Sequence, residues 1–224
     1  MELLIPQPSE IALDVATGTG FTAMEIAPRV KQVLATDITE NMLVEARKNA
    51  QARNLKNIRF EMADASYLPY PDSTFDLVTS RRAPHHFSNI TKFLTEAHRV
   101  LRPGGRLGVS DMSPREGTEE FVNAIERMRD QSHAKALSPS EWRKLLASIG
   151  FEIKREERIY EEVSFEQWLY PVERGGTEEL EIMKAWKNVP KRVRDLMRAK
   201  ESKKGIERWS RSLIVLVASK YNHV

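Results

Sequence analysis

Three carboxylates stand at the ends of apolar runs in the first part of the chain. Asp14 lies in the run 11–15, Asp37 follows the run 32–36, and Asp64 comes shortly after the run 58–62. A carboxylate in such a place can accept hydrogen bonds from the vicinal hydroxyls of a ribose or from an exocyclic amino group. These acidic residues therefore predict a site that binds a nucleoside.

A turn of small residues follows Asp14 almost directly. It contains Ala16, Thr17, Gly18, Thr19 and Gly20. Residues this small let the backbone turn sharply and lie against a ligand, where a larger side chain would block the approach. A glycine turn without a ligand is the alternative, but its position after a first strand favours a ligand-binding turn.

A pair of histidines comes shortly after the apolar run 75–80, in a loop that reads Arg81-Arg82-Ala83-Pro84-His85-His86-Phe87. Imidazoles titrate near neutral pH, so His85 and His86 are the candidate catalytic bases. Packing against the following helix is the alternative for either, and the sequence favours neither histidine over the other. The chain has no cysteine, which excludes thiolate metal ligands and covalent thioether mechanisms, and we expect no metal site.

Alternating strand and helix patterns must position these residues. Apolar runs predict strands at 11–15, 32–36, 58–62, 75–80 and 106–111, and helical periodicity predicts helices at 21–30, 39–53 and 90–101. A parallel neighbour cannot be reached by a tight turn, so this alternation predicts parallel pairing through right-handed crossovers. The carboxyl ends of the strands then share one edge of an α/β sheet, where a crevice accepts ligands.

The second half of the chain is less regular. Helices are predicted near 117–130 and at 140–148, strands at 151–163 and 212–220, and helical segments between 165 and 208. We interpret 165–208 as a helical insertion before the last strand. The whole chain, 1–224, is then a single domain.

Composition limits the class of protein. At 224 residues and 41% hydrophobic, the chain can bury one substantial core. It holds no run of eighteen apolar residues and starts without the pattern of a secretory signal, so we expect a cytoplasmic protein with no membrane span. The net charge of +3 is uneven, since residues 191–211 hold nine Lys or Arg against three Asp or Glu. We expect a solvated basic helix there, with nucleic-acid contact as the alternative.

Two nucleoside cofactors fit the turn, because Gly18-x-Gly20-x-x-Ala23 also matches the dinucleotide fingerprint. However, Asp14 inside the strand, Asp64 after the third strand, FDLVTSR at 75–81 and RVLRPGG at 99–105 together resemble the class I S-adenosylmethionine-dependent methyltransferases. The resemblance is closest to the ubiquinone and menaquinone biosynthesis type and its small-molecule relatives. It covers residues 11–111 and the last strand.

The resemblance implies an α/β fold that is Rossmann-like, with a seven-stranded, mostly parallel sheet, helices on both faces and an antiparallel last strand. It also implies S-adenosyl-L-methionine as cofactor and S-adenosyl-L-homocysteine as product. The turn residues Ala16, Thr17, Gly18 and Gly20 would join Asp14 in holding the methionine part. Asp37 would hold the ribose, Ile38 and Met42 would pack on the adenine, Asp64 with Ala65 would read the adenine edge, and Arg81 would line the cofactor through its backbone.

Two of these positions carry qualifications. The family usually has glycine where this chain has Ala16, so we expect weaker or slightly shifted cofactor binding. Met42 also fits core packing on the apolar face of a helix.

The resemblance implies in-line transfer of a methyl group to a small-molecule acceptor. Residues 1–112 would form the cofactor-binding half. Only about ten residues precede the first strand, so segments 113–137 and 165–208 would cover the acceptor. Completion of the pocket by a second copy, as a homodimer, is left open.

Three alternatives remain. They are an RNA or protein methyltransferase that uses the basic 191–211 stretch, a nicotinamide oxidoreductase, and a non-catalytic cofactor-binding protein of the same fold. The chain lacks an Asn-Pro-Pro-aromatic tetrad and an appended RNA-binding module, so nucleic acid is not the expected partner.

Overall fold

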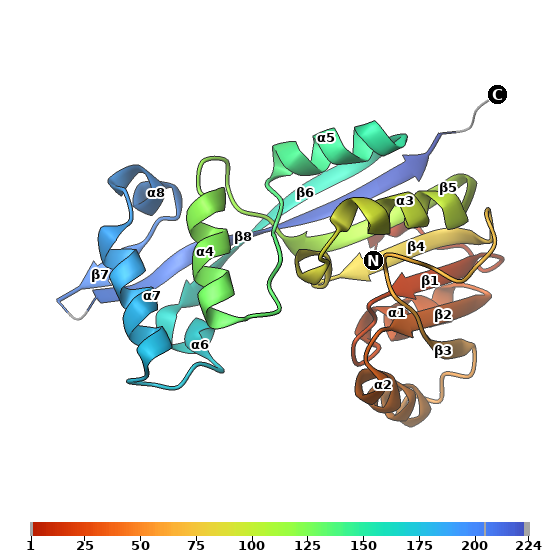
Figure 1. The fold of residues 1–224 in the computed structure, drawn as a ribbon. Helices are drawn as coiled ribbons and strands as arrows, with labels where there is room; N and C mark the ends of the chain where they lie inside the picture. Colours follow the sequence, from red (N-terminus) through yellow and green to blue (C-terminus); the bar gives the residue numbers. More distant parts are fainter. Residues whose placement is uncertain (1, 204, 222–224) are drawn as a thin grey trace.

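The computed structural model describes residues 2–203 and 205–221, and an eight-stranded sheet forms its centre (Figure 1). The strands are β1 (Ile11–Val15), β2 (Gln32–Asp37), β3 (Ile58–Met62), β4 (Phe75–Arg81), β5 (Leu101–Met112), β6 (Phe151–Ser164), β7 (Lys200–Ser202) and β8 (Gly205–Lys220). Their order is β3-β2-β1-β4-β5-β8-β6, and β7 pairs with β8 alone. Strands β1 to β5 are parallel, and β8 runs antiparallel to both β5 and β6.

The predicted Rossmann-like class is confirmed, with one strand more than the seven expected. The additional strand, β7, is three residues long and forms a hairpin with the start of β8. The strand order reverses between β1 and β4, because the chain leaves β1 towards β2 on one side and returns to β4 on the other. Open α/β sheets bind ligands at such a switch point.

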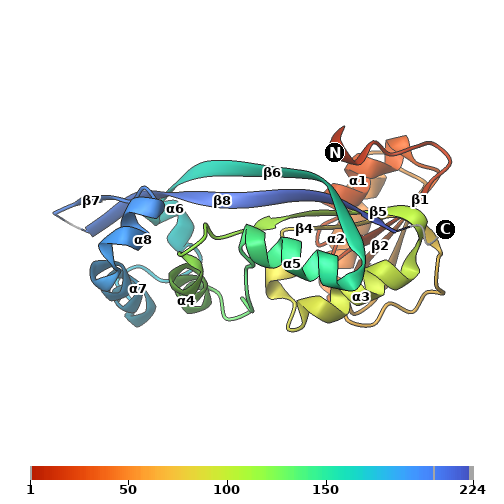
Figure 2. The same cartoon turned by 90° about the horizontal axis from the view of Figure 1, so that it is seen from above.

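Helices cover both faces of the sheet (Figure 2). Helix α1 (Phe21–Ile26) lies on one face, and α3 (Ile90–Val100) and α5 (Pro139–Ile149) lie on the other. Helix α2 (Glu40–Ala52) lies beside α1, since Arg53 at its end forms an ion pair with Glu25 of α1. Side chains alternate along a strand, so Ala12 packs with α1 whereas Leu13 packs with α3 and α5. Short 3-10 helices, η1 (Glu2–Leu4), η2 (Ala27–Arg29) and η3 (Pro84–His86), complete this half.

The second half forms its own apolar cluster beyond the carboxyl ends of β4 and β5 (Figure 1). Helices α4 (Glu119–Arg129), α6 (Phe165–Leu169), α7 (Thr177–Asn188) and α8 (Lys191–Leu196) pack there on the extended β6–β8 ribbon. We call it the satellite cluster, and its buried members are Ile125, Phe165, Trp168, Leu169, Ile182, Trp186, Val189, Met197, Ile206 and Trp209.

Two predictions for this half are wrong. The insertion 165–208 is helical only to Leu196, and the last strand begins at Gly205, not at 212. The charged start of β8 is held as a strand because Arg208 and Arg211 form ion pairs with Glu162 and Glu161 of the neighbouring β6. Trp209, between them, packs 4.9 Å from Trp186 and 5.1 Å from Trp168, measured between ring centroids.

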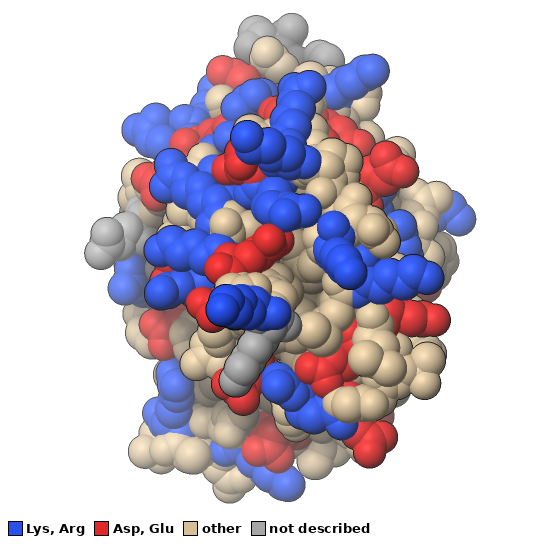
Figure 3. Space-filling view, turned by 90° about the vertical axis from the view of Figure 1, so that its left-hand side faces the viewer, with Lys and Arg blue, Asp and Glu red and all other residues tan. Residues whose placement is uncertain are grey.

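The basic stretch 191–211 is therefore not one helix, because it divides between α8, β7 and β8. Figure 3 shows this end of the molecule, where lysines and arginines are numerous but acidic side chains lie among them. Arg194 pairs with Glu201, and Lys200 pairs with Glu162. None of the helices in the described ranges 2–203 and 205–221 is long and apolar enough to cross a bilayer.

Candidate active site

Asp14 is the most deeply buried carboxylate at the switch point, with 1% of its surface exposed. Its two oxygens accept hydrogen bonds from the hydroxyls of Thr17, at 2.6 Å, and Thr79, at 2.7 Å. Burial raises the pKa of Asp14 from 3.8 to about 6, although these hydrogen bonds oppose the shift. Ionisation of this buried carboxylate is unfavourable without a partner, so Asp14 at the end of β1 is suited to bind a cationic group.

The turn after β1 has a backbone that leaves room for a ligand. Ala16 and Gly18 both have φ of +54°, and Gly20 has φ of +86°. A Cβ on Gly18 would meet nothing within 4 Å, so its backbone faces open space. A Cβ on Gly20 would lie 3.1 Å from Cβ of Ala46, so glycine there lets α2 pack closely.

Asp37 ends β2 and joins the turn. Its carboxylate accepts the N–H of Gly18 at 2.8 Å and the N–H of Thr39 at 3.0 Å. A carboxylate has about four acceptor positions, so two remain for ribose hydroxyls. The same residue therefore fixes the turn and can hold a diol.

Apolar side chains next to Asp37 lie on the surface. Ile38 is 66% exposed and Met42 is 44% exposed. Core packing of Met42 is therefore wrong, and both side chains are available to a flat ring such as adenine. Met62, at the end of β3, is 56% exposed and belongs to the same end of the sheet, a candidate that the sequence reasoning missed.

Asp64 and Ala65 follow β3. The Asp64 side chain accepts the N–H of Ser66 at 2.7 Å and remains exposed, whereas Ala65 is buried. Among the described residues no donor reaches the second oxygen of Asp64, so it can accept from an amino group.

Arg81 ends β4 and lies over the ring of Phe21, with its guanidinium carbon 4.5 Å from the ring centroid. Phe21 is the first residue of α1, so this contact closes one side of the crevice beside the glycine turn. Burial, and then the nearby Arg82, lowers the pKa of Arg81.

His85 is held by a carboxylate that the sequence reasoning missed. Its Nδ1 lies 2.6 Å from Oδ1 of Asp111, and its backbone N–H donates to Oδ2 of the same residue at 2.8 Å. Asp111 is 1% exposed and lies near the end of β5. The signal was present in the sequence, because Asp111 ends an apolar run as Asp14 and Asp37 do.

His86 and His133 complete a group of three imidazoles around η3. The ring centroids of His85 and His86 are 4.0 Å apart, and those of His85 and His133 are 5.6 Å apart. Nδ1 of His86 lies 2.9 Å from the hydroxyl of Ser132. His133 is buried, burial lowers its pKa to about 4, and its Nε2 lies 2.7 Å from Oδ1 of Asn123. No group of three or more metal-ligating side chains occurs among the residues that the structure describes.

The crevice fits a nucleoside cofactor with a cationic end. It offers a buried carboxylate at Asp14, a turn open to solvent at Gly18, a second carboxylate at Asp37 and the exposed apolar surface of Ile38 and Met42. These groups lie in the order in which a methionine, a ribose and an adenine would follow one another along the ends of β1 and β2.

Comparison with known proteins agrees with this geometry. A family model described as a methyltransferase domain matches residues 13–109. The solved structure of a protein from Bacillus halodurans C-125, described as a methyltransferase, superposes with a TM-score of 0.94 at 32% identity and covers 99% of this chain and 97% of that chain.

Two curated relatives match over shorter stretches. The uncharacterized methyltransferase YcgJ of Bacillus subtilis is 35% identical over 167 residues, which cover 74% of this chain and 65% of the relative. The demethylmenaquinone methyltransferase of Deinococcus radiodurans is 45% identical over 115 residues, which cover 50% of this chain and 47% of that enzyme. The matched stretches thus span about half to two thirds of the length of these relatives. Family model, full-length structural match and crevice together show that the chain belongs to the class I S-adenosylmethionine-dependent methyltransferases, with S-adenosylmethionine as its cofactor.

Proposed function

We propose that this methyltransferase acts on a small-molecule acceptor at the carboxyl ends of β4 and β5, and that His85 takes the proton that the acceptor loses. The observation that carries the proposal is the pair of contacts between His85 and the buried carboxylate of Asp111. The name of the Deinococcus relative, a demethylmenaquinone methyltransferase, supports an acceptor of small-molecule size.

Residues of the crevice would hold the cofactor. Asp14 would accept from the methionine ammonium, the backbone of Ala16, Thr17, Gly18 and Gly20 would lie against the methionine part, and Asp37 would accept from the ribose. Ile38 and Met42 would flank the adenine, Asp64 and Ala65 would read its edge, and the backbone of Arg81 would close the crevice. When bound, S-adenosylmethionine supplies a methyl carbon attached to a sulfonium, whose leaving group is a neutral thioether.

The contact with Asp111 sets the tautomer of His85. A carboxylate only accepts, so Nδ1 carries the proton and Nε2 is left with a free lone pair. This nitrogen can take a proton from a hydroxyl or another weakly acidic group as the methyl carbon bonds to it. Asp111 acts through His85, and we regard it as a positioning residue.

His86 and His133 are less suited to this role. Ser132 donates its hydroxyl to Asp130 at 2.6 Å, so it accepts from Nδ1 of His86, and the hydrogen-bond partner of that ring is an exposed serine and not a buried carboxylate. His133 has its Nε2 engaged by a side-chain oxygen of Asn123, which needs a donor. Asn123 also accepts the N–H of Ala136, so the His133 ring anchors the loop.

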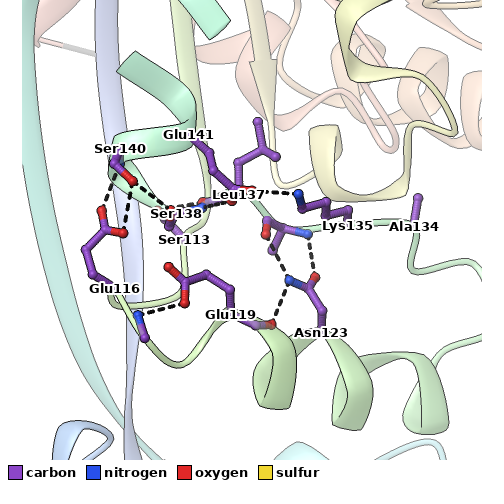
Figure 4. Close-up of polar contacts among 12 residues, drawn as sticks. Ser113, Glu116, Glu119, Asn123, Ala134, Lys135, Leu137, Ser138, Ser140 and Glu141 are labelled. Carbon is purple, nitrogen blue, oxygen red and sulfur yellow. Dashed lines mark hydrogen bonds and ion pairs between the residues drawn. The ribbon is translucent and has the colours of Figure 1, made fainter. Parts of the chain in front are cut away.

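The segment 113–137 would cover the acceptor. Its residues Ala134 and Lys135 donate their N–H groups to the carbonyl of His85, which ties the loop to the proposed base. Figure 4 shows how the same segment is fixed, because Ser113 donates to the carbonyl of Leu137 and Glu116 accepts from Ser140. The satellite cluster, most of whose buried members come from 165–208, lies next to it beyond the strand ends (Figure 1) and would form the outer wall.

The test is a screen of phenols and hydroxy acids for acceptor-dependent formation of S-adenosylhomocysteine, followed by His85→Ala with His86→Ala as the matched control. His85→Ala should bind S-adenosylhomocysteine as the unchanged protein does and lower kcat by about 10²–10⁴-fold. His86→Ala should keep most of the turnover. Full turnover in His85→Ala would remove the assignment of the base, and tight cofactor binding without any acceptor would favour a non-catalytic protein.

A further inference from the structure

A cavity of about 250 Å³ lies on the α1 face of the sheet, next to the cofactor crevice. Its walls come from the 3-10 helix η1, the start of α1 and the neighbouring strands β4, β5 and β8. The lining is mainly apolar, with Leu3, Leu4, Phe21, Val109, Val215 and Val217 among its residues. Space of this size suits one ring with short substituents, because a cavity of about 150 Å³ can already hold benzene.

The cavity shares a wall with the cofactor site. Phe21 and Thr22 line it and follow Gly20 of the glycine turn directly. Thr79 also lines it and donates its hydroxyl to the carboxylate of Asp14. A molecule in the cavity would therefore lie beside the methionine end of the cofactor.

The cavity also ends close to the proposed base. Ser110 lines it, and the next residue of β5 is Asp111, which holds His85. Neighbouring residues of a strand point to opposite faces with their Cα atoms about 3.8 Å apart. The cavity and His85 thus lie on opposite faces of β5, close to the carboxyl end of β4, so an acceptor with its body in the cavity would extend past the end of β4 to present its reacting atom to His85.

Arg81 is the cation of this cavity, and the carboxylate of Asp14 attracts it from a distance without forming an ion pair with it among the described residues. Within the described part of the chain its guanidinium makes the contact with the Phe21 ring and has no hydrogen bond or ion pair. The acidic residue of the lining, Glu25, is occupied by Arg53 at 3.1 Å. A guanidinium presents a planar fork of donors that matches a carboxylate.

We propose that the cavity holds the apolar, ring-sized body of the methyl acceptor and that Arg81 binds a carboxylate on it. The acceptor would then be a small aromatic or similarly flat acid that carries the group to be methylated. The inference rests on the proposed function, because it takes the bound molecule to be the methyl acceptor. Binding of such an acid to the cavity can nevertheless be measured without turnover.

The experiment measures binding of benzoate, and of its neutral isostere benzamide, by ligand-observed NMR at saturating S-adenosylhomocysteine. The variants are Arg81→Met and the matched control Arg82→Met, whose side chain is 53% exposed and lies 3.9 Å from Glu161. We expect benzoate to bind the unchanged protein and Arg82→Met with the same affinity. It should bind Arg81→Met at least fivefold more weakly. Benzamide should bind all three proteins equally weakly. Val215→Phe, which places a ring in the cavity, should abolish benzoate binding with unchanged affinity for S-adenosylhomocysteine.

Equal benzoate affinity in Arg81→Met and Arg82→Met would overturn the inference. A tenfold loss of S-adenosylhomocysteine affinity in Arg81→Met would also overturn it, because Arg81 would then bind the cofactor carboxylate. Failure of the proposed function would give a different result. Full turnover in His85→Ala would remove His85 as the base, but benzoate would still bind and its binding would still depend on Arg81.

Discussion

Asp14→Asn should make the protein more stable at pH 7 while weakening cofactor binding. Burial raises the pKa of Asp14 from 3.8 to about 6. At about 1.4 kcal/mol for each pKa unit, the ionised carboxylate costs the folded state roughly 3 kcal/mol. The folded state binds the proton more tightly than the unfolded state, so this cost is absent below about pH 4, grows as the pH rises, and is complete above about pH 6.

An asparagine avoids this cost but keeps less of the hydrogen bonding. Its single oxygen can accept from Thr17 or from Thr79, and the loss of the other bond costs about 1 kcal/mol. The net gain at pH 7 is therefore about 2 kcal/mol. Urea unfolding between pH 4 and pH 8 measures it as the difference between the two proteins, because all other titrating groups are shared.

Cofactor binding provides a second, independent test of the ionisation of Asp14. A methionine ammonium needs the ionised form of Asp14, so binding near pH 6 should release a proton, and the heat of binding should depend on the buffer. Asp14→Asn should remove this dependence and weaken S-adenosylhomocysteine binding by at least tenfold. Parallel stability profiles for the two proteins, or a less stable variant at pH 7, would refute the assignment of a buried carboxylate with a raised pKa.

Two further substitutions test the crevice. Asp37→Ala should weaken S-adenosylhomocysteine binding by roughly 1–3 kcal/mol in a calorimetric titration, because charge-assisted hydrogen bonds to the ribose are lost along with the hydrogen bond that fixes Gly18. Unchanged affinity would mean that other residues hold the ribose. Ala16→Gly should raise the free energy of unfolding, measured by urea denaturation, by up to about 1 kcal/mol, because φ of +54° strains an alanine more than a glycine. A less stable variant would show that packing of the alanine methyl group outweighs the strain.

The sequence predicted structure best where a local sequence pattern coincides with a fixed position in the sheet. The first four strands and the first three helices were predicted to within a few residues, because apolar runs, turns and helix ends coincide there. The nucleoside crevice followed for the same reason, since Asp14, the glycine turn and Asp37 come at the ends of adjacent parallel strands.

Prediction failed where partners far apart in the chain decide the structure. Residues 205–211 carry the charges of a solvated helix, but Glu161 and Glu162 on β6 neutralise them and hold them in a strand. The pair of His85 and Asp111 was not predicted for a related reason. Asp111 stands at the end of an apolar run, but its partnership with His85 arises from the parallel pairing of β4 with β5, which brings residues far apart in the sequence together.

Strand β8 has a consequence for how this protein can change. Its sixteen residues enter both apolar clusters, with Trp209 in the satellite cluster and Leu216 in the sheet core. Both residues lie within this one continuous strand, with no loop between them, so an exchange of the satellite cluster as a module would cut the strand in its middle. New acceptor preferences would have to arise by replacement of side chains or by redesign of the helices between β6 and β8, while the ribbon that joins the two clusters is kept.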